Sequence, residues 1–328
     1  MITCMLKSEH TPDWKKVFAS GYLGAGDLNQ ICPEISQQEL AKVNSIFPVQ
    51  LTQSLVDSHP AGGEVLRQYL PTAQELINPP GYANDPVGDQ DATLFNGVIK
   101  KYDHRVLLIT THTCPVHCRY CFRKDYPYPH DNPNTHHYKN ALAYITRDSS
   151  LNEVILSGGD PLSLDDDVLA RLIHSLEKIP HIKTVRLHTK FPSVIPERIT
   201  QTFLDTLRTC TLNKVSVFHI NHPDEITDKF CTAAKNIKAT GTTMLNQSVL
   251  LKGVNDNADT LIRLSRKLFA AGILPYYLHL LDHARGTHHF QVEPARIATI
   301  TETMKHALPG YLVPKVAQEI AGKKSKIY

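Results

Sequence analysis

Six short β-branched or aliphatic runs alternate with amphipathic stretches from about residue 104 onwards, and this alternation limits the folds open to the chain. Strand–helix units in series predict a parallel sheet with helices outside it, and right-handed crossovers would curl that sheet into a full or partial barrel. The predicted strands are Val106–Thr111, Glu153–Leu156, Thr184–Leu187, Val215–Ile220, Thr243–Asn246 and Pro275–Leu280. The predicted helices include Asp165–Lys178, Glu197–Thr209, Glu225–Ala239 and Thr260–Ala271. We therefore predict an α/β fold, a partial barrel of six strand–helix units.

The first 95 residues carry no alternating strand pattern, and stretches such as Gln37–Ile46 predict helices. Pro, Gly, Asn and Asp are concentrated in Asn78–Asp91, which we interpret as a loop or linker. These changes of pattern predict a mainly helical N-terminal extension (1–95), the barrel (96–300) and a C-terminal segment (301–328).

Composition excludes several classes of protein. With 41% hydrophobic and 20% charged residues the chain can bury an ordinary core. A net charge of +3, with acidic and basic residues mixed along the chain, does not indicate a nucleic-acid-binding surface. The N-terminus has no apolar leader, and no apolar run approaches the ~18 residues of a membrane span. We expect a cytoplasmic protein that binds neither nucleic acid nor membrane.

A polar cluster follows the carboxyl end of each predicted strand, the rim at which α/β barrels place their chemistry. The first cluster contains Cys114, Cys118 and Cys121, and the last is Asp282. The others are Ser157–Asp160, His188–Lys190, His219–His222 and Asn246–Ser248.

The three clustered cysteines carry the strongest signal. The chain has seven cysteines in all, an odd number that makes a poor disulfide framework and suits a reducing compartment. A structural zinc site would need a fourth ligand, for which His112 or His117 lies nearby. A four-iron cluster on three thiolates instead leaves one iron open, which suits binding a small molecule more than carrying electrons.

This cysteine spacing, with Tyr120 before the third cysteine, is similar to that of the radical S-adenosylmethionine superfamily. The resemblance implies a [4Fe–4S] cluster on the three cysteines, whose open iron chelates the amino and carboxylate groups of S-adenosylmethionine. Ser157–Asp160 resembles the superfamily's Gly-Gly-acid element, although alone it is an ordinary turn. Gly158 and Gly159 would let the backbone approach the cofactor, and Asp160 would pair with its ammonium.

Longer strings resemble the lysine 2,3-aminomutase family, and especially the short bacterial branch that makes (R)-β-lysine for elongation factor P. The resemblance covers roughly three quarters of the chain. It implies an isomerase that depends on pyridoxal phosphate and converts L-lysine to (R)-β-lysine. An electron donor protein, elongation factor P and its ligase would be direct or indirect partners. The strings are KYDHRVLL (Lys101–Leu108), CPVHCRYCFRK (Cys114–Lys124), ILSGGDPL (Ile155–Leu162), HINHP (His219–Pro223), NQSVLLKGVNDN (Asn246–Asn257), PYYLHLLD (Pro275–Asp282) and GYLVPK (Gly310–Lys315).

The family resemblance also implies roles for single residues. Lys326 would hold pyridoxal phosphate as a Schiff base, whereas Lys323, Lys324 and Lys326 by themselves are typical of a solvated basic tail. Lys101 stands where the family has a second phosphate-binding arginine. The full set of implied cofactor-binding residues, besides the glycines and Asp160 above, is Lys326, Arg105, Tyr102, Lys101 and Gln247.

For the substrate, the resemblance places Arg123 on the α-carboxylate, a task suited to a guanidinium, and Asp282 and Glu319 on the distal ammonium. Two converging acids would select a diamino acid over glutamate. Each acid could otherwise be an ordinary surface residue.

The chain also departs from the family. Asn257 stands where longer members have a cysteine, Glu319 replaces an aspartate, and no proline follows Lys326. We expect no zinc and a different or weaker oligomer. The rival hypotheses are an aminomutase for another amino acid such as glutamate, and a non-catalytic iron–sulfur protein.

Overall fold

The computed structural model of the chain describes residues 13–21, 28, 31–32, 34–95, 97–128 and 138–328. One nine-stranded sheet, in the order β1 to β9, runs through it. β1 and β2 form an antiparallel hairpin beside β3, and every later pair is parallel. The strands are β1 Thr93–Phe95, β2 Val98–Ile99, β3 Arg105–Thr111, β4 Glu153–Gly158, β5 Thr184–Thr189, β6 Asn213–Phe218, β7 Thr243–Val249, β8 Leu274–His279 and β9 Lys315–Ala317.

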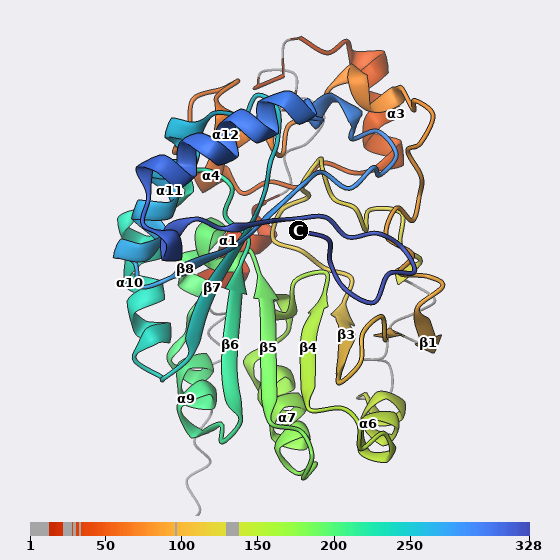
Figure 1. Cartoon of the computed structure of the whole chain (residues 1–328), viewed down its shortest axis with the longest axis vertical. Helices are drawn as coiled ribbons and strands as arrows, with labels where there is room; N and C mark the ends of the chain where they lie inside the picture. The colour runs from red at the N-terminus through yellow and green to blue at the C-terminus, as the bar shows by residue number, and fades with distance from the viewer. Residues whose placement is uncertain (1–12, 22–27, 29–30, 33, 96, 129–137) are drawn as a thin grey trace, which may run out of the picture.

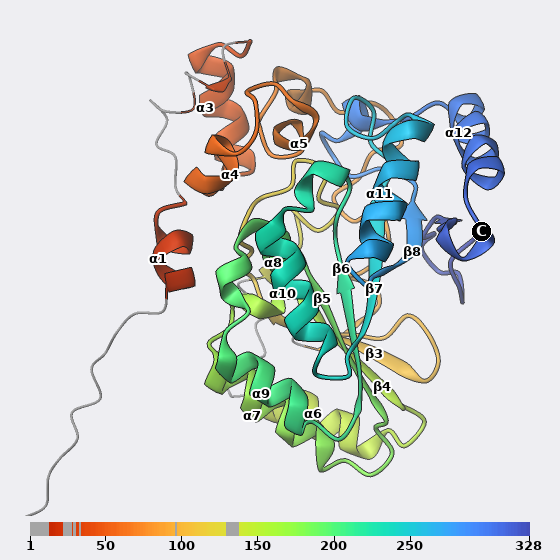
Figure 2. The same ribbon diagram turned by 90° about the vertical axis from the view of Figure 1, so that its left-hand side faces the viewer.

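Amphipathic helices cover one face of this sheet, because each crossover between parallel strands returns along that face. Figure 2 shows α7, α9 and α10 side by side along it. Helix α11 is preceded by Asn257, whose side chain accepts a hydrogen bond from Thr260 N at 2.8 Å. Asn257 therefore acts as a helix cap in this chain. The helices are α6 Lys139–Arg147, α7 Asp166–Glu177, α8 Phe191–Val194, α9 Gln201–Thr209, α10 Asp228–Lys238, α11 Ala258–Ala270 and α12 Pro294–Ala307.

The N-terminal segment adds helices next to the barrel: α1 Asp13–Ala19, α3 Gln37–Ile46, α4 Gln53–Asp57 and α5 Glu64–Arg67. In Figure 1 the strand arrows point toward α3 and α4, so these helices lie at the carboxyl edge of the sheet. Trp14 packs edge-on against Phe191, with ring centroids 5.8 Å apart. One buried apolar cluster contains Trp14, Leu66 and the sheet residue Leu156. The N-terminal segment and the sheet therefore share a core.

The C-terminal segment lies on the other side of the sheet. Figures 1 and 2 together show the chain after β9 running across the carboxyl edge, on the face opposite α7, α9 and α10. No helix in the described ranges is both long and apolar enough to cross a lipid bilayer.

The predicted α/β partial barrel of six strand–helix units with a helical N-terminal extension is confirmed, with β3 to β8 at the six predicted strands. The hairpin β1–β2 and strand β9 were not predicted, since two or three residues are too few to show a period. Helices α6 and α12 were also missed. Each buries only two side chains, so its apolar stripe is narrow.

Candidate active site

The cysteine loop follows β3 and is fastened to the N-terminal segment. Arg119, the residue after Cys118, is fully buried, and its guanidinium donates to both carboxylate oxygens of Glu75 at 2.5–3.1 Å. The same guanidinium donates to Phe47 O at 3.0 Å. Gln50 Nε2 donates to Cys114 O at 2.6 Å. Residues 47–75 therefore position the loop that carries the cysteines.

The three thiols of this loop interact electrostatically. Burial raises the pKa of all three, to about 11 for Cys121, and the charges of Cys121 and Cys118 further raise the pKa of Cys114. Iron binds thiolates, so a cluster would offset this cost of ionisation. Within the described ranges, no set of three or more His, Cys, Asp or Glu side chains is already arranged as a metal site. The donor chemistry of the loop fits a [4Fe–4S] cluster.

Gly158, the last residue of β4, and Gly159 pack against the start of the cysteine loop. A Cβ on Gly159 would lie 2.4 Å from Thr113 O and 2.7 Å from the carbonyl carbon of His112. Gly158 has a φ of +112° and would bring a Cβ within 2.8 Å of Thr111 O. Gly159 N donates to Thr111 O at 2.7 Å. These glycines are required by the approach of two protein loops, whatever they contribute to a ligand.

Asp160 is buried and bound by protein donors. Its carboxylate accepts hydrogen bonds from the Thr189 hydroxyl and from the backbone N–H groups of Leu162, Lys190 and Phe191, at 2.6–3.2 Å. Burial raises its pKa, and these hydrogen bonds oppose that effect. The Asp160 carboxylate thus connects the loop after β4 to the loop after β5. Its predicted pairing with the cofactor ammonium stays a prediction.

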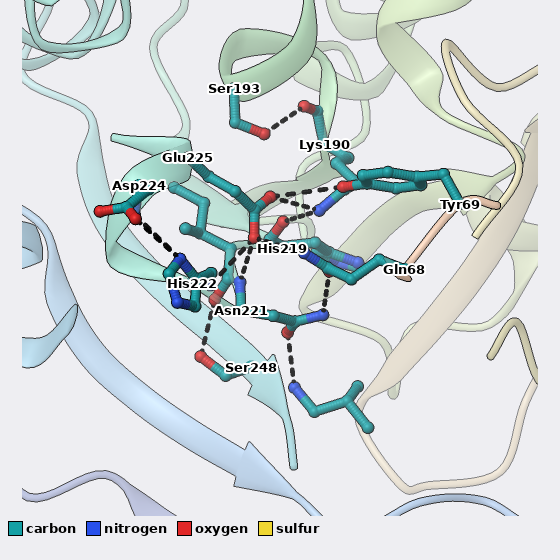
Figure 3. A network of polar contacts seen from close by, with 12 residues as sticks. Gln68, Tyr69, Lys190, Ser193, His219, Asn221, His222, Asp224, Glu225 and Ser248 are labelled. Atoms are coloured by element: carbon teal, nitrogen blue, oxygen red, sulfur yellow. Dashed lines mark hydrogen bonds and ion pairs between the residues drawn. The ribbon is translucent and has the colours of Figure 1, made fainter. Parts of the chain in front are cut away.

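A second buried ion pair joins Lys190 and Glu225, and Figure 3 shows it with its hydrogen-bond partners. Lys190 Nζ donates to Glu225 at 2.8 Å, and both side chains are nearly inaccessible. Glu225 also accepts from the backbone N–H groups of Asn221 and His222 at 2.8 and 2.9 Å. Asn221 Nδ2 in turn donates to the Tyr120 hydroxyl at 2.7 Å. The sequence placed Lys190 and His222 in rim clusters but assigned neither a partner.

A chain of charges runs from Arg123, two residues after Cys121, to the C-terminus. Arg123 pairs with Asp89, and its Nη1 donates to Ser157 Oγ at 3.3 Å. Asp89 Oδ1 lies 2.5 Å from Lys101 Nζ, and Lys101 donates to Glu319 at 2.8 Å. Glu319 then accepts from Lys326 at 2.5 Å. Asp89 lies in the segment predicted as a loop, where an acid carries no pattern to mark it.

The C-terminal tail folds back as a hairpin that holds Lys326. Gln318 and Ile327 exchange two backbone hydrogen bonds of 3.0 Å. The Tyr328 hydroxyl lies 2.9 Å from that of Tyr277. The side chain of Lys326 is 21% exposed, whereas Lys323 and Lys324 are exposed to solvent. The structure thus singles out Lys326 among the tail lysines as the one directed inward.

Asp282 and Glu319, the two predicted ammonium ligands, are electrostatically coupled. Burial, and then the charge of Glu319, raises the pKa of Asp282 to about 7. Burial also acts to raise the pKa of Glu319, but Lys326 and Lys101 outweigh it and hold that pKa at about 2. Glu319 therefore stays ionised at neutral pH, whereas Asp282 gains or loses its proton near pH 7.

The predicted phosphate residues separate into two groups. The guanidinium carbon of Arg105 lies 4.4 Å from the centre of the Tyr102 ring. The guanidinium of Arg105 has no ion pair or hydrogen bond with any other residue that the structure describes. A free guanidinium beside a phenol fits a phosphate. Lys101, in contrast, is already engaged by the carboxylates of Asp89 and Glu319.

Gln247 faces histidines of the neighbouring strands. Its Nε2 lies 2.8 Å from Nε2 of His219, whose ring centre is 5.7 Å from that of His188. Burial lowers the pKa of both imidazoles, to about 3 for His219, and that of His279 to about 3 as well. The inner wall next to Arg123 and Lys326 is therefore polar but uncharged, a feature that the sequence did not indicate.

Comparison with known proteins bears on this arrangement. The Radical SAM superfamily matches residues 108–264. The chain is 42% identical over 297 residues to the L-lysine 2,3-aminomutase of Haemophilus influenzae, covering 90% of this chain and 88% of that protein. It is 38% identical over 327 residues to the L-lysine 2,3-aminomutase of Escherichia coli K12, covering 98% and 95%. With the enzyme of that name from Clostridium subterminale the identity is 32% over 316 residues, covering 94% and 76%.

The matched region contains the cysteine loop and the two glycines packed against it. A [4Fe–4S] cluster and S-adenosylmethionine are the cofactors that define radical SAM enzymes. The match to the Escherichia coli enzyme covers 98% of the chain and so extends well beyond the barrel. The chain therefore belongs to the L-lysine 2,3-aminomutase family of radical SAM isomerases.

Proposed function

We propose that this protein converts L-lysine to (R)-β-lysine with the help of pyridoxal phosphate. The observation that carries the proposal is the buried chain of charges from Arg123 to Lys326. It offers a guanidinium for a carboxylate at one end and the acids Glu319 and Asp282 for an ammonium at the other. Glutamate would place a second carboxylate against those acids. The (R) configuration is supported by the resemblance to the short bacterial branch.

The geometry above supports the following assignment of residues to the cofactors. Cys114, Cys118 and Cys121 would ligate the cluster. Lys326 would hold pyridoxal phosphate, and the stacked Arg105 and Tyr102 would hold its phosphate. When bound, these groups supply a substrate radical and a temporary carrier for the migrating nitrogen.

The chain's own residues bind, orient and shield. Arg123 is kept in place by Asp89 and Ser157, so a carboxylate paired with it is held in one orientation. The neutral imidazoles of His188, His219 and His279 line the wall without attracting a competing ion. The C-terminal hairpin lies across the carboxyl edge of the sheet and would help to exclude water (Figure 1).

The test is an anaerobic assay with reconstituted protein, both organic cofactors and a reductant. L-lysine, L-ornithine and L-glutamate are supplied separately, and the products are resolved by chiral chromatography. The proposal expects (R)-β-lysine from lysine and no turnover of glutamate. β-Glutamate as the main product would refute it, as would cleavage of S-adenosylmethionine without any β-amino acid.

We further propose that the enzyme works in the cytoplasm with a one-electron donor protein, and that its product serves elongation factor P through a separate ligase. The six described cysteines are all free thiols, as a reducing compartment maintains them. The link to elongation factor P is supported by sequence resemblance alone. Deletion of the gene followed by mass analysis of the factor tests it, with loss of the β-lysyl mass as the expected result.

A further inference from the structure

Lys101 sits at the centre of the charge chain, where each of its ammonium hydrogens has an acceptor nearby. Nζ donates to Val87 O and to Glu319 Oε1, both at 2.8 Å. Asp89 Oδ1 lies 2.5 Å away in an ion pair that is too poorly angled for a hydrogen bond. An ammonium has three donors. Two of these donors are used in hydrogen bonds, and the charge of the ammonium is also paired with Asp89.

A phosphate would have to displace one of these acceptors. Asp89 is 2% exposed, and Glu319 is mostly buried, so a displaced carboxylate would gain little water and would keep only its second cation, Arg123 for Asp89 or Lys326 for Glu319. Removing one partner from a buried group of charges is unfavourable. The Arg105 guanidinium has no such partner among the described residues and can take the phosphate. This contrast argues against the phosphate-binding role that sequence resemblance implies for Lys101.

Lys101 instead joins two carboxylates that serve opposite ends of the proposed substrate site. Asp89 holds Arg123, the proposed partner of the substrate carboxylate. Glu319 is a proposed partner of the distal ammonium. Asp89 and Glu319 lie far apart in the sequence, on the loop before β1 and on the tail after β9. Their shared contact with one ammonium fixes the separation of the two ends.

We propose that Lys101 is a positioning residue that sets the distance between the carboxylate end and the ammonium end of the substrate site, and so selects the length of the diamino acid. This inference rests on the proposed function. We expect lysine to span the separation that Lys101 holds, and ornithine, one methylene shorter, to span it less well. Arg105, and not Lys101, carries the cofactor phosphate.

The test compares Lys101→Met with Arg105→Gln as the matched control, because each removes one predicted phosphate ligand. Binding of pyridoxal phosphate and of pyridoxal, which lacks the phosphate, is measured by absorbance on cofactor-free protein without turnover. We expect Lys101→Met to change the ratio of the two dissociation constants by less than about threefold. Arg105→Gln should shift that ratio against the phosphate form by about tenfold or more.

The second measurement is the ratio of kcat/KM for lysine to that for ornithine. We expect Lys101→Met to lower this ratio by about tenfold or more, within the range that one methylene contributes to selectivity. Lys101→Gln, whose amide can still donate to Val87 O, replaces the methionine variant if that variant does not fold. A selective loss of pyridoxal phosphate affinity, or an unchanged lysine-to-ornithine ratio, would overturn the inference. Wild-type protein inactive on lysine would instead refute the proposed function, and the binding comparison would still decide where the phosphate is held.

Discussion

The ammonium of Lys326 donates a 2.5 Å hydrogen bond to the carboxylate of Glu319, seven residues earlier and on the opposite arm of the C-terminal hairpin. The backbone pairing of Gln318 with Ile327 keeps the two side chains on the same side of the hairpin. A lysine near the end of a chain is ordinarily solvated. Here the hairpin and Tyr328 hold it in place although no proline follows it.

The first prediction concerns which lysine carries the cofactor. Borohydride reduction of the protein with pyridoxal phosphate, followed by peptide mass mapping, should label Lys326, because it alone among the tail lysines is directed inward. Lys326→Ala should abolish the label. Lys324→Ala is the matched control and should keep it, since Lys324 is exposed. A label on Lys324 in the wild-type protein would contradict the assignment.

The second prediction concerns the pH dependence of lysine binding. With a pKa of about 7, Asp282 is ~90% ionised at pH 8 and ~10% ionised at pH 6. Only the ionised form attracts an ammonium, so KM for lysine should rise about tenfold as pH falls over this range. The charges that face Asp282 are those of Glu319, Lys326, Lys101 and Asp89. Of these, Glu319 remains ionised throughout, because its pKa is about 2.

The control for this pH dependence is Asp282→Asn, which removes the titrating group. The variant should bind lysine more weakly at pH 8 and show a flat profile between the two pH values. An unchanged profile in the variant would assign the pH dependence to another group and remove Asp282 from the ammonium site.

The third prediction concerns the contact between Gly159 and the cysteine loop. Gly159→Ala places a Cβ 2.4 Å from Thr113 O, so the cysteine loop must shift. We expect a destabilisation of about 1–3 kcal/mol and a lower iron content after reconstitution. Gly310→Ala is the control, since a Cβ there meets no atom within 4 Å. Equal iron content in the two variants would show that the close approach does not position the cysteines.

The fourth prediction concerns the buried pair of Arg119 and Glu75, whose side chains are 0% and 4% exposed. Glu75→Gln leaves the guanidinium without its charged partner, which should lower the free energy of unfolding by about 3–5 kcal/mol. Arg208→Gln breaks the exposed pair with Asp205 and should change it by less than about 1 kcal/mol. Urea unfolding of the cluster-free protein measures both. Similar midpoints for the two variants would mean that the loop is held by other contacts.

The positions of the strands could be predicted from the sequence, whereas the ion-pair partners of the polar side chains could not. Strands β3, β4 and β5 bury alternating or continuous runs of mainly aliphatic side chains, and that pattern can be read from the sequence. Asp89, in contrast, acquires its role from Lys101 and Arg123, which are distant in the sequence. Which side chain meets which carboxylate depends on the fold as a whole.

Lys101 and Asp160 illustrate the same limit. The family resemblance implied that Lys101 binds the cofactor phosphate and that Asp160 binds the ammonium of S-adenosylmethionine. In the structure Lys101 is engaged by two protein carboxylates, and Asp160 by four protein groups. The chemistry of a side chain can be predicted from the sequence, but the use of its donors or acceptors within the protein cannot.

The most direct test of the proposed function follows the nitrogen itself. L-lysine labelled with ¹⁵N at its 2-amino group and with ¹³C along its chain is incubated anaerobically with the reconstituted enzyme, and the product is examined by NMR. The proposal predicts ¹⁵N coupled to carbon 3, with the distal amino group unlabelled. Label that stays on carbon 2 while S-adenosylmethionine is consumed would contradict it.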